Sequence, residues 1–175
     1  TAVAVCAAVE RTAGVRPKIK WTNDLVLHGK KLCGILTELA VEGETGLVQS
    51  LVIGAGVNVS HTPEDFGPEV SAMATSLAQE GYQVSRPALA AAMIEELYRL
   101  SGDLGGDISP WVEAYRRDCV NLGRPVRLLW TDRQTEAEAV DIDGQFGLVV
   151  RLPDGSLTTV RTGEVSVRGL YGYVE

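Results

Sequence analysis

The sequence predicts an α+β fold in which a mixed or antiparallel sheet with flanking helices is followed by a small β-barrel. Three observations predict this fold. An apolar helical segment opens the chain, alternating segments joined by tight turns follow it, and short strands separated by turns fill residues 126–168. With 175 residues, of which 45% are hydrophobic, the chain can bury a core without disulfide bonds.

The first predicted element is a helix over residues 1–11, and Gly14 provides its C-terminal stop. The helix is apolar on every side until its end, so we expect other elements to cover all of its faces. A chain that starts inside a buried helix is expected to be part of a longer protein, or to begin at an artificial boundary.

A meander of antiparallel strands is predicted next, because alternating or apolar stretches are separated by turn residues. Gly54 and Gly56 interrupt the last of these strands, which we expect to be buried. Two glycines in such a strand indicate close approach by another backbone or by a ligand. The predicted strands cover residues 18–21, 25–27, 31–40 and 47–59.

Helices are predicted over residues 71–80, 85–101 and 110–119. The second of them is the clearest, because Ser85 stands at its cap position and Pro87 lies in its first turn.

Residues 121–125, Asn-Leu-Gly-Arg-Pro, predict a boundary between a first domain, residues 1–121, and a second domain, residues 122–175. Short strands joined by Asp-Gly turns fill the second domain. We expect them to close into an SH3-like barrel, because closure removes exposed strand edges. The predicted strands cover residues 126–130, 136–142, 146–152, 157–160 and 164–168.

Composition excludes several classes of protein. Sixteen basic and 23 acidic residues give a net charge of −7, so the chain has no general basic face for nucleic acid. Its apolar stretches are too short to cross a membrane, and we infer a cytoplasmic protein. Cys6, Cys33 and Cys119 are scattered and odd in number, which predicts reduced, buried thiols. Two histidines are too few to favour a transition-metal site.

One predicted hairpin concentrates polar groups. Lys20 and Lys31 supply ammonium groups, and Asn23 supplies an amide. Asp24 and Glu38 supply carboxylates. This combination suits a site in which a fixed ammonium neutralises a phosphate while a carboxylate orients an amine or a magnesium ion. The alternative is a surface hairpin with solvated lysines and a polar turn, and spacing alone favours that alternative.

Several motifs of this region resemble one family. Residues 20–24, Lys-Trp-Thr-Asn-Asp, resemble the K-W-P-N-D signature of biotin protein ligases, and residues 31–38 are similar to their K-L-x-G-I-L-x-E segment. The resemblance extends over essentially the whole chain and implies a partial biotin/lipoate ligase fold, class II synthetase-like, followed by the SH3-like barrel. The other matching segments are residues 54–59 (G-x-G-x-N), 74–77 (A-T-S-L) and 123–126 (the barrel entry).

The resemblance implies ATP-dependent attachment of biotin to a lysine of a biotin carboxyl carrier protein, from acetyl-CoA carboxylase or a similar biotin-dependent enzyme. In that family ATP adenylates the biotin carboxylate, and the carrier lysine attacks biotinyl-5′-AMP. Lys31 would be the catalytic lysine that stabilises charge growing on the α-phosphate. Asp24 would orient or deprotonate the incoming amine. Mg²⁺ is implied with ATP, without an assigned ligand, and relatives imply a homodimer formed through their sheets.

The resemblance also implies binding roles. Asn58 would contact the adenine, and Gly54 and Gly56 would let the ligand approach closely. For Trp21 and Leu36 we expect ordinary burial instead. The remaining binding residues implied by the family pattern are Lys20, Asn23, Gly34, Ile35 and Arg168.

Two departures from the family pattern bear on function. Thr22 stands where the family has Pro, a mild change because Thr also accepts extended backbone. Relatives carry an upstream Gly/Arg-rich loop that folds over biotin and AMP, and the sequence lacks it. We therefore expect this chain by itself to be inactive. A lipoate-ligase relative and a noncatalytic binding remnant stay open as alternatives, whereas transcriptional repression would need a helix-turn-helix that this sequence does not contain.

Overall fold

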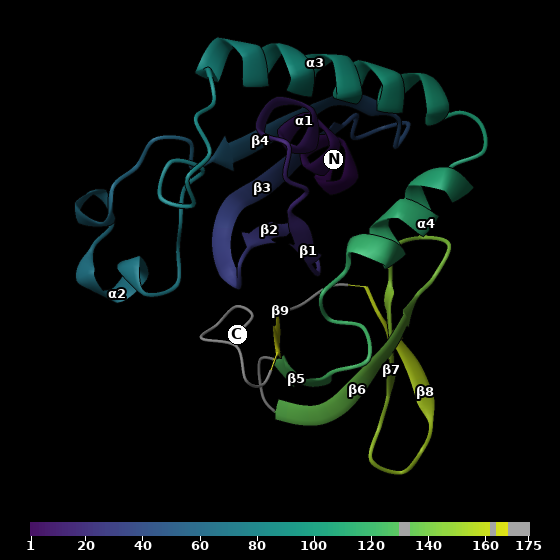
Figure 1. Cartoon of the computed structure of the whole chain (residues 1–175). Coiled ribbons are helices and arrows are strands. Elements are labelled where there is room, and N and C mark those ends of the chain that lie inside the picture. The colour runs from purple at the N-terminus through teal and green to yellow at the C-terminus, as the bar shows by residue number, and fades with distance from the viewer. Residues whose placement is uncertain (130–133, 162–163, 168–175) are drawn as a thin grey trace.

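The computed structural model describes residues 1–129, 134–161 and 164–167, which form two antiparallel sheets with helices around the first (Figure 1). The predicted α+β class is confirmed. The part that precedes the second sheet consists of α1 (Ala2–Ala13), β1 (Lys18–Lys20), β2 (Asp24–Leu27), β3 (Lys30–Val41), β4 (Val48–Val57), the 3₁₀ turn η1 (Pro63–Asp65), α2 (Pro68–Ser71), α3 (Arg86–Asp103) and α4 (Ser109–Asp118).

The helix α1 ends where the sequence predicts. Gly14 has a φ of 72°, and its N–H donates to the Glu10 carbonyl at 2.9 Å, which forms a left-handed C-cap. Val5 and Val9 are fully buried. The helix packs against α3 on one side and against β1 and β2 on the other (Figure 1), so the predicted cover on its apolar faces is confirmed.

The first sheet has the strand order β1-β2-β3-β4, all antiparallel, which confirms the predicted meander. The strands β3 and β4 are much longer than β1 and β2, so the far half of their hairpin extends beyond the other two strands. Leu39, Val48 and Leu51 are therefore exposed there. The prediction that the strand over residues 47–59 is buried is wrong for this half.

The segment after β4 differs from its prediction. Only Pro68–Ser71 are helical, and the predicted helix over residues 71–80 is a series of turns. Its polar side chains bond to other segments instead of facing solvent: buried Ser76 donates through Oγ to the His61 carbonyl at 2.6 Å. Thr75 donates its N–H to the Lys31 carbonyl at 2.9 Å. These bonds to distant backbone compete with the local helix.

The two later helices are close to their predictions. Ser85 is the N-cap residue of α3, although its side chain makes no capping hydrogen bond. The helix α4 ends in Asp118, whose buried carboxylate lies 2.7 Å from Arg16 Nη2 and 3.3 Å from Lys18 Nζ. These ion pairs attach the end of α4 to the segment that leads into β1. In the described part of the chain, no helix combines the length and apolarity needed to cross a membrane.

The second sheet has the order β8-β7-β6-β5-β9, all antiparallel. Its five strands confirm the predicted ones within a few residues. Among the described residues no ladder joins β8 to β9, so the predicted barrel is not seen to close. The strands are β5 (Pro125–Leu129), β6 (Gln134–Ile142), β7 (Leu148–Arg151), β8 (Leu157–Val160) and β9 (Glu164–Val167).

Trp21 connects the two halves of the molecule. It is buried, as predicted, and its indole N–H donates to the Phe146 carbonyl at 2.9 Å. Its backbone N–H donates to Asn121 Oδ1 at 2.8 Å. The motif that carries the family resemblance is therefore anchored to both sides of the predicted domain boundary.

The three cysteines are free thiols buried in the core, which confirms their prediction. Burial raises the pKa of Cys6 and of Cys33 to about 12, and that of Cys119 to about 11. Such thiols act as small apolar side chains at neutral pH.

Candidate functional site

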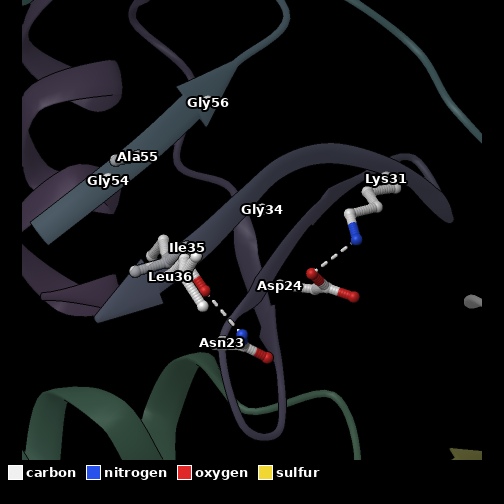
Figure 2. A pocket seen from close by; sticks show the side chains of 9 residues that line it. All are labelled: Asn23, Asp24, Lys31, Gly34, Ile35, Leu36, Gly54, Ala55 and Gly56. Carbon is white, nitrogen blue, oxygen red and sulfur yellow. Dashed lines mark hydrogen bonds and ion pairs between the residues drawn. The ribbon is translucent and has the colours of Figure 1, made fainter. Parts of the chain in front are cut away.

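An open pocket of about 540 Å³ lies where β2, β3 and β4 meet (Figure 2). It collects most of the residues that the sequence singled out. It is lined by Asn23, Asp24, Lys31, Gly34, Ile35, Leu36, Gly54, Ala55 and Gly56.

The register of the sheet explains why these residues meet. Lys20 pairs with Asp24, Asp24 with Gly34, and Gly34 with Gly56, so one row crosses all four strands. Residues directly opposite each other point to the same face of a sheet. The Asp24 carboxylate is therefore presented on the same face as two glycines that carry no side chain.

A β-bulge brings Lys31 to this face. Strict alternation would place Lys31 and Gly34, three residues apart, on opposite faces of β3. Leu25 pairs with Cys33 but the next residue, Val26, pairs with Lys31, so β3 contains one extra residue at Leu32. Leu32 and Cys33 are both buried, as expected where alternation is interrupted. Lys31 thereby joins the face of Asp24.

Lys31 and Asp24 form an ion pair with Nζ 2.7 Å from Oδ1 (Figure 2). The lysine side chain is 34% exposed and the aspartate side chain 16% exposed, so the pair lies at the wall of the pocket and remains accessible to a ligand. A lysine ammonium carries three N–H donors, which suit the oxygens of an anionic ligand.

The glycines leave the floor of the pocket without side chains. A Cβ built on Gly34 would lie 3.4 Å from Lys31 Cε and 3.6 Å from Nζ, directly beneath the ion pair. A Cβ on Gly54 or Gly56 would meet only a carbonyl oxygen, at 3.8 and 3.9 Å. None of the three has a positive φ. The backbone conformation therefore does not require glycine at these three positions. Glycine there leaves the space above the sheet open.

Asn23 lies at the edge of the pocket and fastens the turn to β3. Its Nδ2 donates to the Ile35 carbonyl at 2.5 Å, and Ile35 N–H donates to the Asn23 carbonyl at 3.0 Å. Tyr115 Oη adds a hydrogen bond to the Thr22 carbonyl at 2.8 Å. These bonds give Asn23 a structural role in the turn, and its nucleotide contact stays a prediction.

Among the described residues, two predicted binding residues lie apart from the pocket lining. Lys20 belongs to the cross-strand row but is not a lining residue. Asn58 donates one N–H of its Nδ2 to the Thr75 carbonyl at 2.9 Å, so an adenine contact would come from Oδ1 or from the second N–H of Nδ2. Arg168 lies outside the described residues.

Two lining residues were missed or misjudged by sequence reasoning. Leu36 was expected to be buried, but it is 64% exposed and lines the pocket, because β3 has already passed the end of β2. Ala55 also lines the pocket. Its position between two glycines already marked as a close-approach segment was the available signal.

A second cavity, which the sequence does not predict, lies on the other face of β3 and β4. It has a volume of about 530 Å³ and a mostly apolar lining, including Ile35, Ile53 and Leu97. The start of α1 and parts of α3 and α4 complete its walls. Because side chains alternate along a strand, this cavity and the Lys31 pocket share strands but face opposite ways.

Two family models match the sequence. The model of the "Biotin/lipoate A/B protein ligase family" matches residues 1–58, and that of the "Biotin protein ligase C terminal domain" matches residues 122–168. The first match contains every residue that lines the Lys31 pocket.

Curated relatives match nearly the whole chain. The bifunctional ligase/repressor BirA of Bacillus subtilis is 32% identical over 169 residues, covering 93% of this chain and 47% of the relative. BirA of Escherichia coli is 33% identical over 167 residues, covering 94% and 50%. The biotin--[acetyl-CoA-carboxylase] ligase of Mycobacterium tuberculosis is 31% identical, covering 84% and 52%. The chain thus spans about half the length of these relatives.

Solved structures show the same fold. The apo biotin protein ligase from Aquifex aeolicus superposes with a TM-score of 0.81 at 22% identity, covering 95% of this chain and 72% of the other. The same ligase in complex with biotin and ATP superposes with a TM-score of 0.79 at 21% identity, covering 95% and 68%.

Proposed function

Because the chain belongs to the biotin protein ligase family, we propose that it carries the lysine side of the active site of an ATP-dependent ligase. This ligase would join biotin to a lysine of a biotin carboxyl carrier protein. The observation that carries the proposal is the Lys31–Asp24 ion pair, with 2.7 Å between Nζ and Oδ1, beside a floor of glycines. The relative named for acetyl-CoA carboxylase supports a carrier of that class as the partner.

In the first step, a carboxylate oxygen of biotin attacks the α-phosphorus of ATP, and pyrophosphate leaves. Negative charge grows on the phosphate oxygens as the new bond forms. Lys31 is suited to stabilise this charge because Asp24 already holds its ammonium in place, so little reorganisation is needed during the reaction. The bare floor over Gly34, Gly54 and Gly56 lets the adenylate lie close to the backbone.

In the second step, the amine of the carrier lysine attacks the carbonyl carbon of biotinyl-5′-AMP, and AMP leaves. The amine loses a proton as the amide bond forms. Asp24 is proposed to orient the amine and to accept this proton, which its partly accessible side chain at the pocket wall supports. Asn58, Lys20 and Arg168 are proposed to contact the nucleotide, on the support of the family pattern alone.

Magnesium is proposed to arrive with the phosphates of ATP. Within the described ranges, no group of three or more His, Cys, Asp or Glu side chains is placed to hold a metal ion. Magnesium bound to nucleotides keeps several waters and needs few protein ligands. The side chains of the described residues do not build a resident metal site, and no step is assigned to one.

The second sheet is proposed to be an SH3-like barrel in a domain that begins near residue 122. In its strand order β5 lies between β6 and β9, so the first strand of the sheet pairs with the last; closure would in addition require pairing between the edge strands β8 and β9. The homodimer and the cytoplasmic location stay predictions from the sequence.

The pocket is open, and the whole ligase is proposed to close it. The ion pair contributes one cation to the wall, whereas adenylation of a carboxylate develops charge on several oxygens. Relatives are about twice as long as the aligned region, and an arginine-rich clamp outside this region is proposed on the support of the family pattern alone. On this proposal the chain by itself is inactive.

The test is adenylate formation by the full-length ligase from α-labelled ATP, with biotin or lipoate offered separately. We expect labelled biotinyl-AMP and its transfer to a carrier protein. Lipoyl-AMP as the main product would instead favour the lipoate-ligase alternative, against which the match to the biotin protein ligase C-terminal domain already argues. Absence of any saturable binding of a biotinyl-AMP analogue would favour a noncatalytic remnant.

A further inference from the structure

The backbone of Lys31 is held by a segment that lies more than forty positions further along the chain. Lys31 N–H donates to the Met73 carbonyl at 2.8 Å, and Thr75 N–H donates to the Lys31 carbonyl at 2.9 Å. The strand β4 does not reach this point, because its pairing with β3 starts at Cys33. Residues 73–75 therefore replace β4 as the neighbour of β3 where Lys31 is attached.

Glu80 ties this segment to the turn that precedes Lys31. Thr75 Oγ1 donates to Glu80 Oε1 at 2.6 Å, and His28 Nδ1 lies 2.5 Å from Glu80 Oε2. Thr75 is buried, and the Glu80 side chain is 18% exposed. His28 stands in the reversal between β2 and β3 with a φ of 47°, a conformation that needs support in a non-glycine residue. The Glu80 carboxylate thus connects the segment that pairs with Lys31 to the turn that precedes Lys31.

The charge state of Glu80 fits this arrangement. Burial by itself would raise the pKa of this carboxyl group, but the hydrogen bonds from His28 and Thr75 and the charges of His28 and Lys30 outweigh burial and lower it. The carboxylate is therefore ionised at neutral pH and accepts both bonds. Asn58 adds a third attachment, because its Nδ2 donates to the Thr75 carbonyl at 2.9 Å.

We propose that Glu80 is a positioning residue for Lys31, acting through Thr75 and His28 to fix the strand end from which the lysine side chain reaches Asp24. The proposal rests on the proposed function for its catalytic consequence. A lysine side chain has four rotatable bonds, so its ammonium finds one position only if its backbone is fixed and its far end is held. Asp24 holds the far end, and Glu80 fixes the near end.

The direct test is competitive acetylation of the full-length ligase with a trace of acetic anhydride, read by mass spectrometry as the ratio of labelling at Lys31 to that at Lys18. Lys18 is the internal reference because its ammonium pairs with Asp118 and not with Asp24 or Glu80. An ammonium must leave its carboxylate before it can react. In Glu80→Ala we expect the ratio to rise about fivefold, the change in an equilibrium that one lost hydrogen bond produces.

Two further comparisons separate positioning from general loosening. Glu80→Gln keeps an acceptor for Thr75, and its amide can donate to His28 Nδ1 once the imidazole proton moves to Nε2, so it should keep the wild-type ratio. Thr75→Val should raise the ratio whereas Thr75→Ser, which keeps the hydroxyl, should not. Glu69→Ala, an exposed glutamate in α2, is the matched control and should change nothing. If Glu80→Ala fails to fold, the comparison of Thr75→Val with Thr75→Ser still tests the proposal.

In the adenylation assay, we expect Glu80→Ala to lower kcat about fivefold and to leave KM for biotin and ATP unchanged, with rescue by Glu80→Gln. Unchanged labelling of Lys31 in both Glu80→Ala and Thr75→Val would overturn the proposal. If labelling changes as expected but the wild-type ligase forms no adenylate, the proposed function fails and the positioning of Lys31 by Glu80 stands.

Discussion

The glycine floor allows ligand position and fold stability to be tested separately, through Gly56→Ala. Apart from its chain neighbours, the nearest heavy atom to a Cβ at position 56 is the Gly34 carbonyl oxygen, at 3.9 Å. This is ordinary van der Waals contact, and the φ of Gly56 is not positive, so the fold should accept the methyl group. Alanine restricts the unfolded chain, and we expect a gain of about 0.4–1 kcal/mol in the free energy of unfolding. The melting temperature should rise by about 1–4 °C.

The same methyl group would occupy space in which the proposed adenylate lies against β4. A displacement of about 1 Å at a reacting centre costs about 10²-fold in rate, so kcat/KM for biotin should fall about 10²-fold in a variant that is no less stable. The assay is adenylate formation by the full-length ligase, accompanied by thermal melts. Gly43→Ala is the matched control, because its Cβ would meet nothing within 4 Å and lies outside the pocket. Unchanged kcat/KM in Gly56→Ala would refute the placement of the ligand over this floor.

Three further predictions concern single side chains. Lys31→Ala should abolish adenylate formation and change the free energy of unfolding by about 1 kcal/mol or less, because its ion pair is partly exposed; a variant that turns over like wild type would contradict this. Asp118→Asn should lower the free energy of unfolding by about 3 kcal/mol at pH 7, since a buried ion pair loses its charge while Arg16 keeps Glu10. Burial by itself would raise the pKa of Asp118, but Arg16, Arg117 and Lys18 outweigh burial and lower it. Its contribution is therefore present above the unfolded pKa near 3.9 and is lost as the pH falls through the folded pKa, so the difference between wild type and Asp118→Asn should shrink in denaturation curves below about pH 4. Cys33, with its pKa raised to about 12, should react with iodoacetamide about 10³-fold more slowly at pH 8 in the folded ligase than after unfolding; equal rates would show that the thiol is not buried.

The residues next to a helix end or a turn were enough to predict the elements whose ends depend on those residues alone. Gly14 ends α1 because a left-handed cap suits glycine, and turn residues separate the strands of the meander. The predicted helix over residues 71–80 failed for the opposite reason. Thr75 and Ser76 have their partners at Lys31 and His61, far away in sequence, and no local periodicity reveals such bonds.

The sequence predicted most residues of the candidate site but not how they are arranged. Family motifs assigned Lys31 and Asp24 to one catalytic site, whereas spacing alone favoured a solvated hairpin. The extra residue at Leu32 brings the two side chains to the same face of the sheet. Such a bulge interrupts alternation, so it cannot be predicted by reasoning that takes side chains to alternate strictly along a strand. The apolar cavity behind β3 and β4 was also not predicted, because it depends on how α1, α3 and α4 pack.

The central claim is that the Lys31 ammonium stabilises charge on the phosphate of an adenylate lying over the glycine floor. The most direct measurement is a crystal structure of the full-length ligase with a non-hydrolysable biotinyl-AMP analogue. We predict that the ligand covers Gly34 and Gly56, with Lys31 Nζ about 2.7–3.2 Å from an oxygen of the phosphate or of the group that replaces the acyl linkage. An analogue bound elsewhere, with Lys31 turned to solvent or paired with Asp24 alone, would contradict the claim.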